Sequence, residues 1–308
     1  MTNAPSSLSR RRLLRAGAAF GFASLAPLLR GSRPLSSLLT PQEAMADTPA
    51  TIALGDPSNF DLRAPGSRLQ RLPVGMHFYK RKWPLGALGT VRYLQGPHSF
   101  DIPRVSSVMG ASAPDIPDEG IYSWGIGAFA MNGERIPHSI ARDRLFALFD
   151  DILRAGWQRF VLPSEPRLAQ ADALRYALSA KGFYPPDPRY VPTKEQWMQL
   201  NQHLPYWTFW ADGVYLKVQV IDEPALRDPE GQGVYMFSMD LESEAGHFWV
   251  YFREVEDMKR WKELIPAELE AVSRQRPRVE AELRSQGYTI DESYRDPPIL
   301  ALGQAPGA

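Results

Sequence analysis

The fold is decided by residues 206–221, which read YWTFWADGVYLKVQVI and predict a β-hairpin. Aromatic and β-branched residues fill both arms, and these residue types are enriched in strands. Asp212-Gly213 stands between the arms, where a type I′ turn requires two positions that tolerate positive φ. A second hairpin is predicted from residues 234–241 and 247–252, joined around 243–246. Hairpins of this kind build antiparallel sheet.

Helical patterns stand between these strand-like segments. Residues 139–155 carry apolar side chains at helical spacing and end at Gly156, where a left-handed cap is expected. A second helix is predicted from Pro166 to Gly182. A third begins with Thr193-Lys194-Glu195-Gln196, a capping box, and a last helical region covers 255–286, divided by Pro266 and Pro277. The fold class predicted is therefore α+β: an antiparallel sheet built from hairpins with amphipathic helices packed on it.

Composition changes along the chain suggest its organisation. Residues 47–75 are rich in Pro, Gly, Ser, Ala and Asp and are interpreted as a linker. Residues 76–295 form the globular region, with short strands in 76–131 and a long proline-punctuated loop around Pro103, Pro114 and Pro117. A division into subdomains 76–138 and 139–295 stays open. The Pro/Gly-rich tail, 296–308, is predicted to be disordered.

The first 46 residues resemble a twin-arginine export signal. Ser9, Arg10 and Arg11 are followed, one residue later, by two hydrophobic residues, Leu13 and Leu14, and a base. An apolar run of 14 residues follows, which is shorter than the roughly 20 residues of a membrane-spanning helix. Small residues at Ala44 and Ala46 predict cleavage before residue 47, although an earlier cleavage point is an alternative. The signal implies the twin-arginine translocase as a partner during export and a periplasmic destination.

Composition excludes several classes of function. The chain of 308 residues has no cysteine, so disulfides, thiolate metal sites, lipidation at cysteine and a cysteine nucleophile are ruled out. Removal of residues 1–46 leaves 29 basic and 34 acidic residues. This mild acidity argues against binding nucleic acid or anionic membranes.

Candidate catalytic groups are few. His98 and Asp101 share a short segment with Ser106 and Ser107 nearby, which suggests a hydrolase as the alternative hypothesis. Ser112 stands in an incomplete Gly-x-Ser-x-Gly pattern, which favours a turn serine. Nucleotide-binding glycine loops and haem attachment motifs are absent, so no cofactor is predicted.

Carboxylates cluster at the end of the second predicted hairpin. Asp240, Glu242 and Glu244 would share one face if the strand continues, because alternate residues of a strand point the same way. A hard cation prefers such oxygens, yet no calcium-loop spacing is met, and a solvated acidic edge is the preferred interpretation. A metal or cofactor carrier would require the scattered histidines to converge with Asp240 or Glu242.

Aromatic residues crowd both predicted hairpins. They either fill a sheet covered on both sides or form an exposed face for a partner, because Trp, Tyr and Arg dominate the energetics of interfaces. The candidate partner-binding residues are Trp207, Trp210, Tyr215 and Trp249, with Arg167 and Arg189 at the rim.

Residues 145–220 resemble immunity proteins of bacterial type VI secretion effectors. The resemblance is carried by segments 155–160, 165–168, 187–192 with Trp197, and 211–216. Such proteins lie in the periplasm and neutralise delivered toxins, but they usually carry a lipoprotein cysteine or an ordinary secretory signal, from which this chain departs. The resemblance covers about a quarter of the chain. It implies an exported protein that acts by binding a protein toxin, without catalysis.

Overall fold

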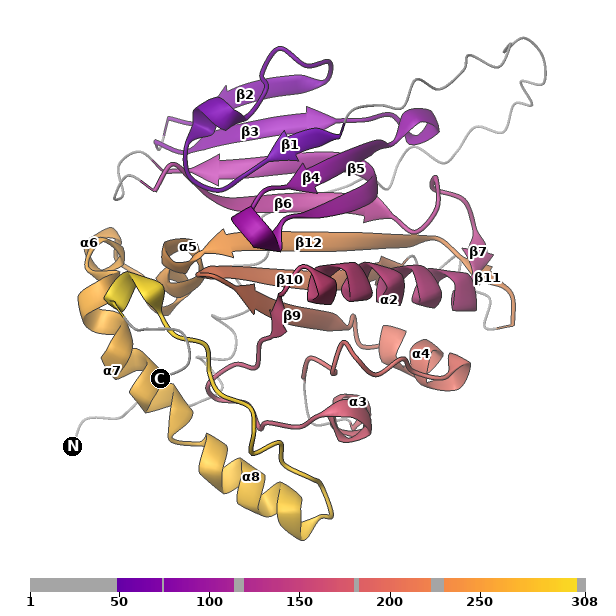
Figure 1. Cartoon of the computed structure of the whole chain (residues 1–308), viewed down its shortest axis with the longest axis vertical. Coiled ribbons are helices and arrows are strands. Elements are labelled where there is room, and N and C mark those ends of the chain that lie inside the picture. The colour runs from indigo at the N-terminus through magenta and orange to yellow at the C-terminus, as the bar shows by residue number, and fades with distance from the viewer. Residues whose placement is uncertain (1–48, 74, 114–118, 180–182, 223–229, 304–308) are drawn as a thin grey trace.

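The computed structural model describes residues 49–73, 75–113, 119–179, 183–222 and 230–303, and it confirms the α+β class (Figure 1). One ten-stranded sheet dominates, with the path β1-β4-β5-β6-β12-β10-β9-β8, and β3 joins β5 to β2 beside it. All its recorded pairings are antiparallel except β1 with β4. Its strands are β1 (Ala50–Ile52), β2 (Ser67–Arg71), β3 (His77–Lys82), β4 (Gly89–Tyr93), β5 (Phe100–Ser112), β6 (Ile121–Phe129), β8 (Gln158–Arg159), β9 (Tyr206–Ala211), β10 (Val214–Asp222) and β12 (Tyr235–Ser243).

The first predicted hairpin is confirmed. Strand β9 pairs with β10 in a register that brings Ala211 opposite Val214. The turn residues Asp212 and Gly213 both have positive φ, 43° and 77°. This is the conformation that the Asp-Gly pair predicts.

The second predicted hairpin is wrong. Strand β12 pairs instead with β10 and with β6, while residues 247–252 lie in helix α5 (Glu244–Phe248), the short helix η5 (Trp249–Tyr251) and the turn after it. Ser243 caps α5 by accepting a hydrogen bond from the Gly246 N–H. The aromatic residues after it therefore pack as helical side chains against a second core.

The predicted proline-rich loop is mostly a strand. Strand β5 runs from Phe100 to Ser112 and pairs with β3, β4 and β6. Pro103 is accommodated because the register with β4 shifts between Val91 and Gly89, which leaves extra β5 residues outside the ladder. Residues 114–118, with Pro114 and Pro117, lie outside the described residues. Residues 47–75, predicted to be a linker, contribute β1 and β2 to the sheet.

One face of the sheet is covered by helix α2 (His138–Arg154), which runs in front of β10 and β9 in Figure 1. Phe146 and Phe149 of α2 contact Trp207 of β9, with ring centroids 6.0 and 5.1 Å apart. Helix α4 (Lys194–Asn201) packs beside α2, and α3 (Gln170–Leu178) packs on α4. The capping box predicted at Thr193 is confirmed, because both of its hydrogen bonds with Gln196 are present. Helix α3 begins four residues later than predicted, and the Pro166 and Leu168 carbonyls instead accept bonds from Tyr184 and Arg159.

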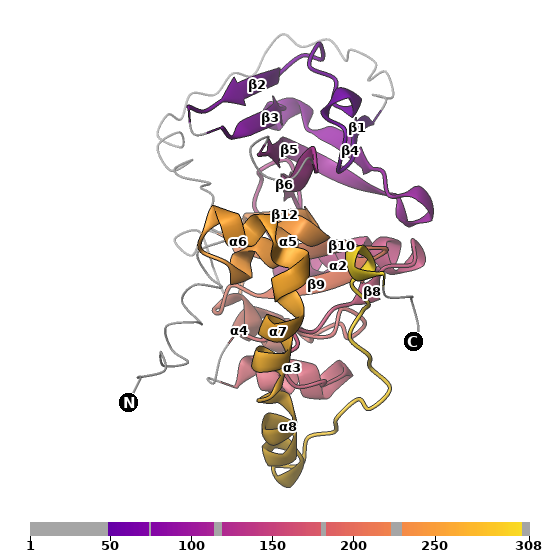
Figure 2. The same ribbon diagram turned by 90° about the vertical axis from the view of Figure 1, so that its left-hand side faces the viewer.

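The predicted last helical region consists of α6 (Val255–Lys259), α7 (Trp261–Ser273) and α8 (Arg276–Ser285). These helices run down the left-hand edge of the molecule in Figure 1 and face the viewer in Figure 2. Pro266 lies inside α7 and does not divide it, whereas Pro277 stands in the first turn of α8, where its missing N–H is harmless. Among the described residues, no helix has the length and apolar character needed to cross a bilayer.

The tail predicted to be disordered is ordered through residue 303. It returns to the sheet and ends in the short helix η6 (Leu300–Leu302). Glu244 accepts hydrogen bonds from the backbone N–H groups of Leu300 and Ala301 at 2.6 and 2.7 Å. Ile299 is buried in the second core with Trp261 and Ile265. These contacts join the tail to the first turn of α5.

The division into subdomains at residue 138 has no counterpart in the sheet. Strand β6, before that point, pairs with β12, after it, along seven residue pairs from Met236↔Phe129 to Glu242↔Ser123. The main core likewise joins Trp124 and Ile126 of β6 to Phe149 of α2 and Leu241 of β12. A two-stranded sheet of β7 (Ile136–Pro137) and β11 (Gln232–Gly233) lies beside them.

Candidate functional site

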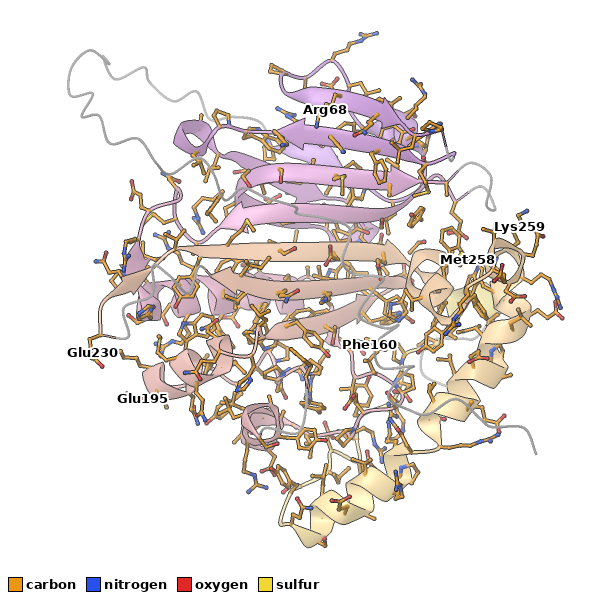
Figure 3. The ribbon with its side chains drawn as sticks, turned by 180° about the vertical axis from the view of Figure 1, so that it is seen from behind. Arg68, Phe160, Glu195, Glu230, Met258 and Lys259 are labelled. Atoms are coloured by element: carbon orange, nitrogen blue, oxygen red, sulfur yellow. The ribbon has the colours of Figure 1, made fainter. Side chains whose placement is uncertain are left out.

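The central strands carry a polar surface on the side turned away from α2. Side chains alternate along each strand, so the residues that flank the buried core residues face the other way. Figure 3 shows this side with its strands uncovered by the described helices over most of their length. We call it the polar face, and it consists of Lys217 and Gln219 from β10, Ser238, Asp240 and Glu242 from β12, and Gly125 and Gly127 from β6.

Glycines form the floor of the polar face. Gly125 lies opposite Asp240, and Gly127 lies opposite Ser238. A Cβ added at Gly125 would meet only the Asp240 carboxylate and the Met109 carbonyl, at 3.7 and 3.9 Å. A missing side chain in a strand lets another backbone approach closely. The surface above Gly125 is therefore open beside a carboxylate.

Asp240 is the central charged group of the polar face. It stands directly opposite Lys217 in the β10–β12 ladder. Burial raises the pKa of Asp240 to about 6, with Lys217 lowering it and Glu242 raising it. The ammonium of Lys217 also lies 5.4 Å from the ring centroid of Tyr206. A carboxyl group with this pKa can change its charge near neutral pH and favours a cation close to it.

A histidine–carboxylate pair closes one end of the polar face. His247 Nδ1 of α5 lies 3.5 Å from Glu242 Oε2, and both side chains are partly exposed. The imidazole stacks on the ring of Tyr215, which stands opposite Glu242 in the ladder. Burial, followed by the charge of Glu242, raises the pKa of the nearby Tyr122 to about 12. Tyr122 therefore stays a neutral hydroxyl beside this pair.

The predicted acidic edge is confirmed in part. Asp240 and Glu242 share one face of β12, and a histidine does converge on Glu242. Glu244 does not belong to this group, because the strand ends at Ser243 and Glu244 begins α5 as a buried residue that holds the tail. Within the described ranges, no group of three or more His, Asp or Glu side chains is arranged to hold a metal ion.

The aromatic residues proposed as an exposed binding surface are buried. Trp207 lies in the main core under α2, and Trp210, Tyr215 and Trp249 lie in the second core with α5 and α7. All four are at most 7% exposed. The sheet is covered on both sides at this end, so this part of the predicted partner surface is wrong and the sheet-core alternative holds.

The two arginines proposed at the rim have different roles. Arg167 forms a bidentate ion pair with the buried carboxylate of Glu280 in α8. Arg189 has an exposed side chain, and its backbone N–H donates to Asp187. Arg167 therefore serves the fold, and Arg189 alone of the six predicted residues is exposed.

The structure separates the groups of the hydrolase hypothesis. His98 Nδ1 binds the Ala155 carbonyl at the end of α2, at 2.7 Å. Asp101 pairs with Arg92, at 3.2 Å. Ser106 donates to the Gly127 carbonyl, and Ser112 is buried. His98 and Asp101 are thus oriented by other partners rather than by each other.

The export signal and cleavage residues, from Ser9 to Ala46, lie outside the described residues. Lys217 and the open floor at Gly125 were missed as site residues. The alternation of residues along a strand predicts which face of the sheet Lys217 and Gly125 occupy. Only the pairing of β12 with both β10 and β6 places these residues beside Asp240.

The chain matches no family model, and no curated protein or solved structure was found to be similar to it.

Proposed function

We propose that this is an exported periplasmic protein that binds a protein partner without catalysis and acts as an inhibitory, immunity-type protein. The observation that carries the proposal is the polar face. Helix α2 covers the opposite side of the sheet, whereas the described helices leave most of this side of the strands uncovered. Asp240, Lys217 and Gly125 are partly exposed there.

The chemistry of the polar face favours a partner of basic character. Asp240 and Glu242 follow one another along the same face of β12, and Lys217 and His247 each lie beside one of them. A partner that adds an arginine or lysine next to Asp240 would favour its charged form and oppose the effect of burial. The glycine floor admits the main chain that carries this side chain.

The proposed destination rests on the twin-arginine motif at Arg10 and Arg11. A fusion of the leader to a reporter that is active only outside the inner membrane tests it. We expect export with the native leader and loss of export when both arginines are changed to lysine. A reporter that stays inside the cell with intact arginines would contradict the proposed periplasmic location. The binding surface is tested by a separate experiment.

The binding surface is tested by blocking it. In Gly125→Arg a long side chain would occupy the space beside Asp240. Gly86→Arg is a matched control, because a Cβ added at Gly86 meets no atom within 4 Å and Gly86 lies in the helix η2 (Leu85–Ala87), away from the polar face. Circular dichroism and thermal unfolding first establish that both variants are folded.

The readout is protection of cells against candidate toxins, which are taken from the products of neighbouring genes, together with recovery of the toxin by the tagged chain. We expect the wild type and Gly86→Arg to protect and to retain the toxin. Gly125→Arg should lower retention at least tenfold and abolish protection. Equal protection by both variants would exclude the polar face, and failure of the wild type to protect or to retain any partner would exclude the immunity function.

A further inference from the structure

Arg104 occupies a strained position in the bulge of β5. The register between β4 and β5 shifts here, from Val91↔Ile102 to Gly89↔Val105. Arg104 has a φ of 57°, in the left-handed region that residues other than glycine seldom adopt. Strain of this kind clusters at functional sites, and a bulge redirects the side chain that it carries.

The redirected side chain reaches the end of β6, where a second arginine also binds the backbone. Arg104 Nε–H donates to the Phe129 carbonyl at 3.0 Å. Arg144, from α2, donates to the carbonyl of the next residue, Ala130, and its Nη1 lies 3.2 Å from Met131 Sδ. Two guanidinium groups from separate elements therefore bind consecutive carbonyls, those of the last residue of β6 and of the residue after it.

The positive charge of these arginines is not balanced within the described part of the chain. Neither Arg104 nor Arg144 is within 4.0 Å of a described carboxylate, and both side chains are only half-buried. Burial, followed by repulsion from Arg144, lowers the pKa of Arg104. The carbonyls take only one nitrogen of each guanidinium, and a guanidinium carries five N–H donors. Donors for an anion therefore remain on both.

We propose that Arg104 and Arg144 form an oxyanion-binding site that takes a carboxylate or phosphate group between the two guanidinium groups. Planar guanidinium forks match the oxygens of such groups with paired hydrogen bonds. An anion here would relieve the repulsion between the two arginines. The site comes from β5 and α2 and shares no residue with the polar face, so it does not depend on the proposed function.

The full chain, labelled with ¹⁵N-arginine, tests the site by NMR of the Nε–H signals. Inorganic phosphate and acetate are titrated separately at constant ionic strength, which is balanced with potassium chloride. We expect two Nε–H signals to shift together with one dissociation constant. Assignment uses Arg104→Lys and Arg144→Lys, which keep a positive charge near the carbonyls but lack the planar fork.

Each lysine variant should remove one of the two signals and weaken binding of the anion at least threefold. Arg92→Lys is the matched control, since Arg92 is an exposed β4 arginine that pairs with Asp101, and it should leave the titration unchanged. A response to phosphate but not acetate assigns a phosphate group, and a response to acetate assigns a carboxylate. Shifts no larger than those caused by chloride, or shifts that persist equally in both variants, would overturn the proposal.

A second measurement uses stability. Phosphate should raise the unfolding temperature of the wild type and of Arg92→Lys more than chloride at equal ionic strength does, because a ligand of the native state alone stabilises it. In Arg104→Lys and Arg144→Lys this difference should fall by more than half. An equal rise in all four proteins would count against the site.

Discussion

Tyr215 and His247 stack ring on ring, with centroids 3.7 Å apart and an interplanar angle of 7°. The contact joins β10 to α5 at the point where the sheet passes from its open polar face to its helix-covered end. Phe160 meets both rings edge to face, at centroid distances of 5.0 and 5.5 Å. The imidazole therefore packs against two aromatic rings while its Nδ1 lies beside the Glu242 carboxylate.

Replacing His247 tests how much this stack holds α5 in place. His247→Ala should lower the free energy of unfolding by about 1–2 kcal/mol, because it removes aromatic contacts on two sides. His247→Phe keeps a ring and should lose less than half of that. Urea unfolding followed by tryptophan fluorescence provides the measurement. Equal losses in both variants would assign the effect to the Glu242 contact rather than to stacking.

The pH dependence of stability should reveal Asp240. Burial raises the pKa of Asp240 to about 6 in the folded chain, against about 3.9 in an unfolded one. The folded state therefore binds the proton of the Asp240 carboxyl group more tightly than the unfolded state does. The stability that this protonated group contributes is complete below pH ~4 and is lost as the pH rises through about 6.

Asp240→Asn removes this titration. At pH 7 the variant should be more stable than the wild type by about 1–3 kcal/mol. The upper value corresponds to a pKa difference of about two units, and the lower value allows for solvent screening of a partly exposed group. At pH 4 the difference should be much smaller. Urea midpoints at the two pH values provide the check, and a difference that does not grow with pH would refute the assignment to Asp240.

Local chemistry explains which elements could be predicted from the sequence. The β9–β10 hairpin depends on Asp212-Gly213, and the start of α4 depends on Thr193 and Gln196, so both are encoded within a few residues. The helical conformation of residues 247–251 is different. It depends on packing of Phe248 against Trp261, whose centroids lie 5.5 Å apart, and β propensity carries no information about that distant contact.

The candidate site shows the same division. The alternation of β12 predicts that Asp240 and Glu242 share a face, and the structure confirms it. Lys217 and Gly125 come to Asp240 from separate strands, so their proximity requires the strand order β6-β12-β10. The buried state of Trp210 and Trp249 likewise depends on α7, which follows them in the chain and covers them.

The return of the tail depends on Glu244. Its carboxylate accepts both the Leu300 and Ala301 N–H groups, and a glutamine offers a single acceptor oxygen. Glu244→Gln should therefore cost about 1 kcal/mol, because one partly buried N–H donor loses its acceptor. Hydrogen exchange at the amides of residues 300 and 301 should accelerate in the variant. Unchanged protection at both amides would show that packing of Ile299 is sufficient to hold the tail.

The ion pair of Arg167 and Glu280 should be the strongest polar contribution to stability from α8. Glu280 is 3% exposed and accepts three hydrogen bonds from Arg167, two from the guanidinium and one from the backbone N–H. Burial acts to raise the pKa of Glu280, but these bonds outweigh it and hold the pKa below its ordinary value. The stability that the pair contributes is thus present above pH ~4.3 and is lost as the pH falls through the lower folded-state pKa.

Glu280→Gln should lower the free energy of unfolding at pH 7 by about 2–4 kcal/mol, because it leaves a partly buried guanidinium without its counter-ion. Arg167→Gln and the double variant complete the cycle, in which the coupling energy should be about 1–3 kcal/mol. Arg274→Gln, which removes the exposed arginine just after α7 from its pair with Glu270, is the control and should change stability by less than about 0.5 kcal/mol. At pH 3 the loss caused by Glu280→Gln should shrink, since the wild-type carboxylate begins to protonate. A loss that is as large at pH 3 as at pH 7 would mean that the glutamine disturbs packing and that the charge of Glu280 is not what holds α8 to the segment before α3.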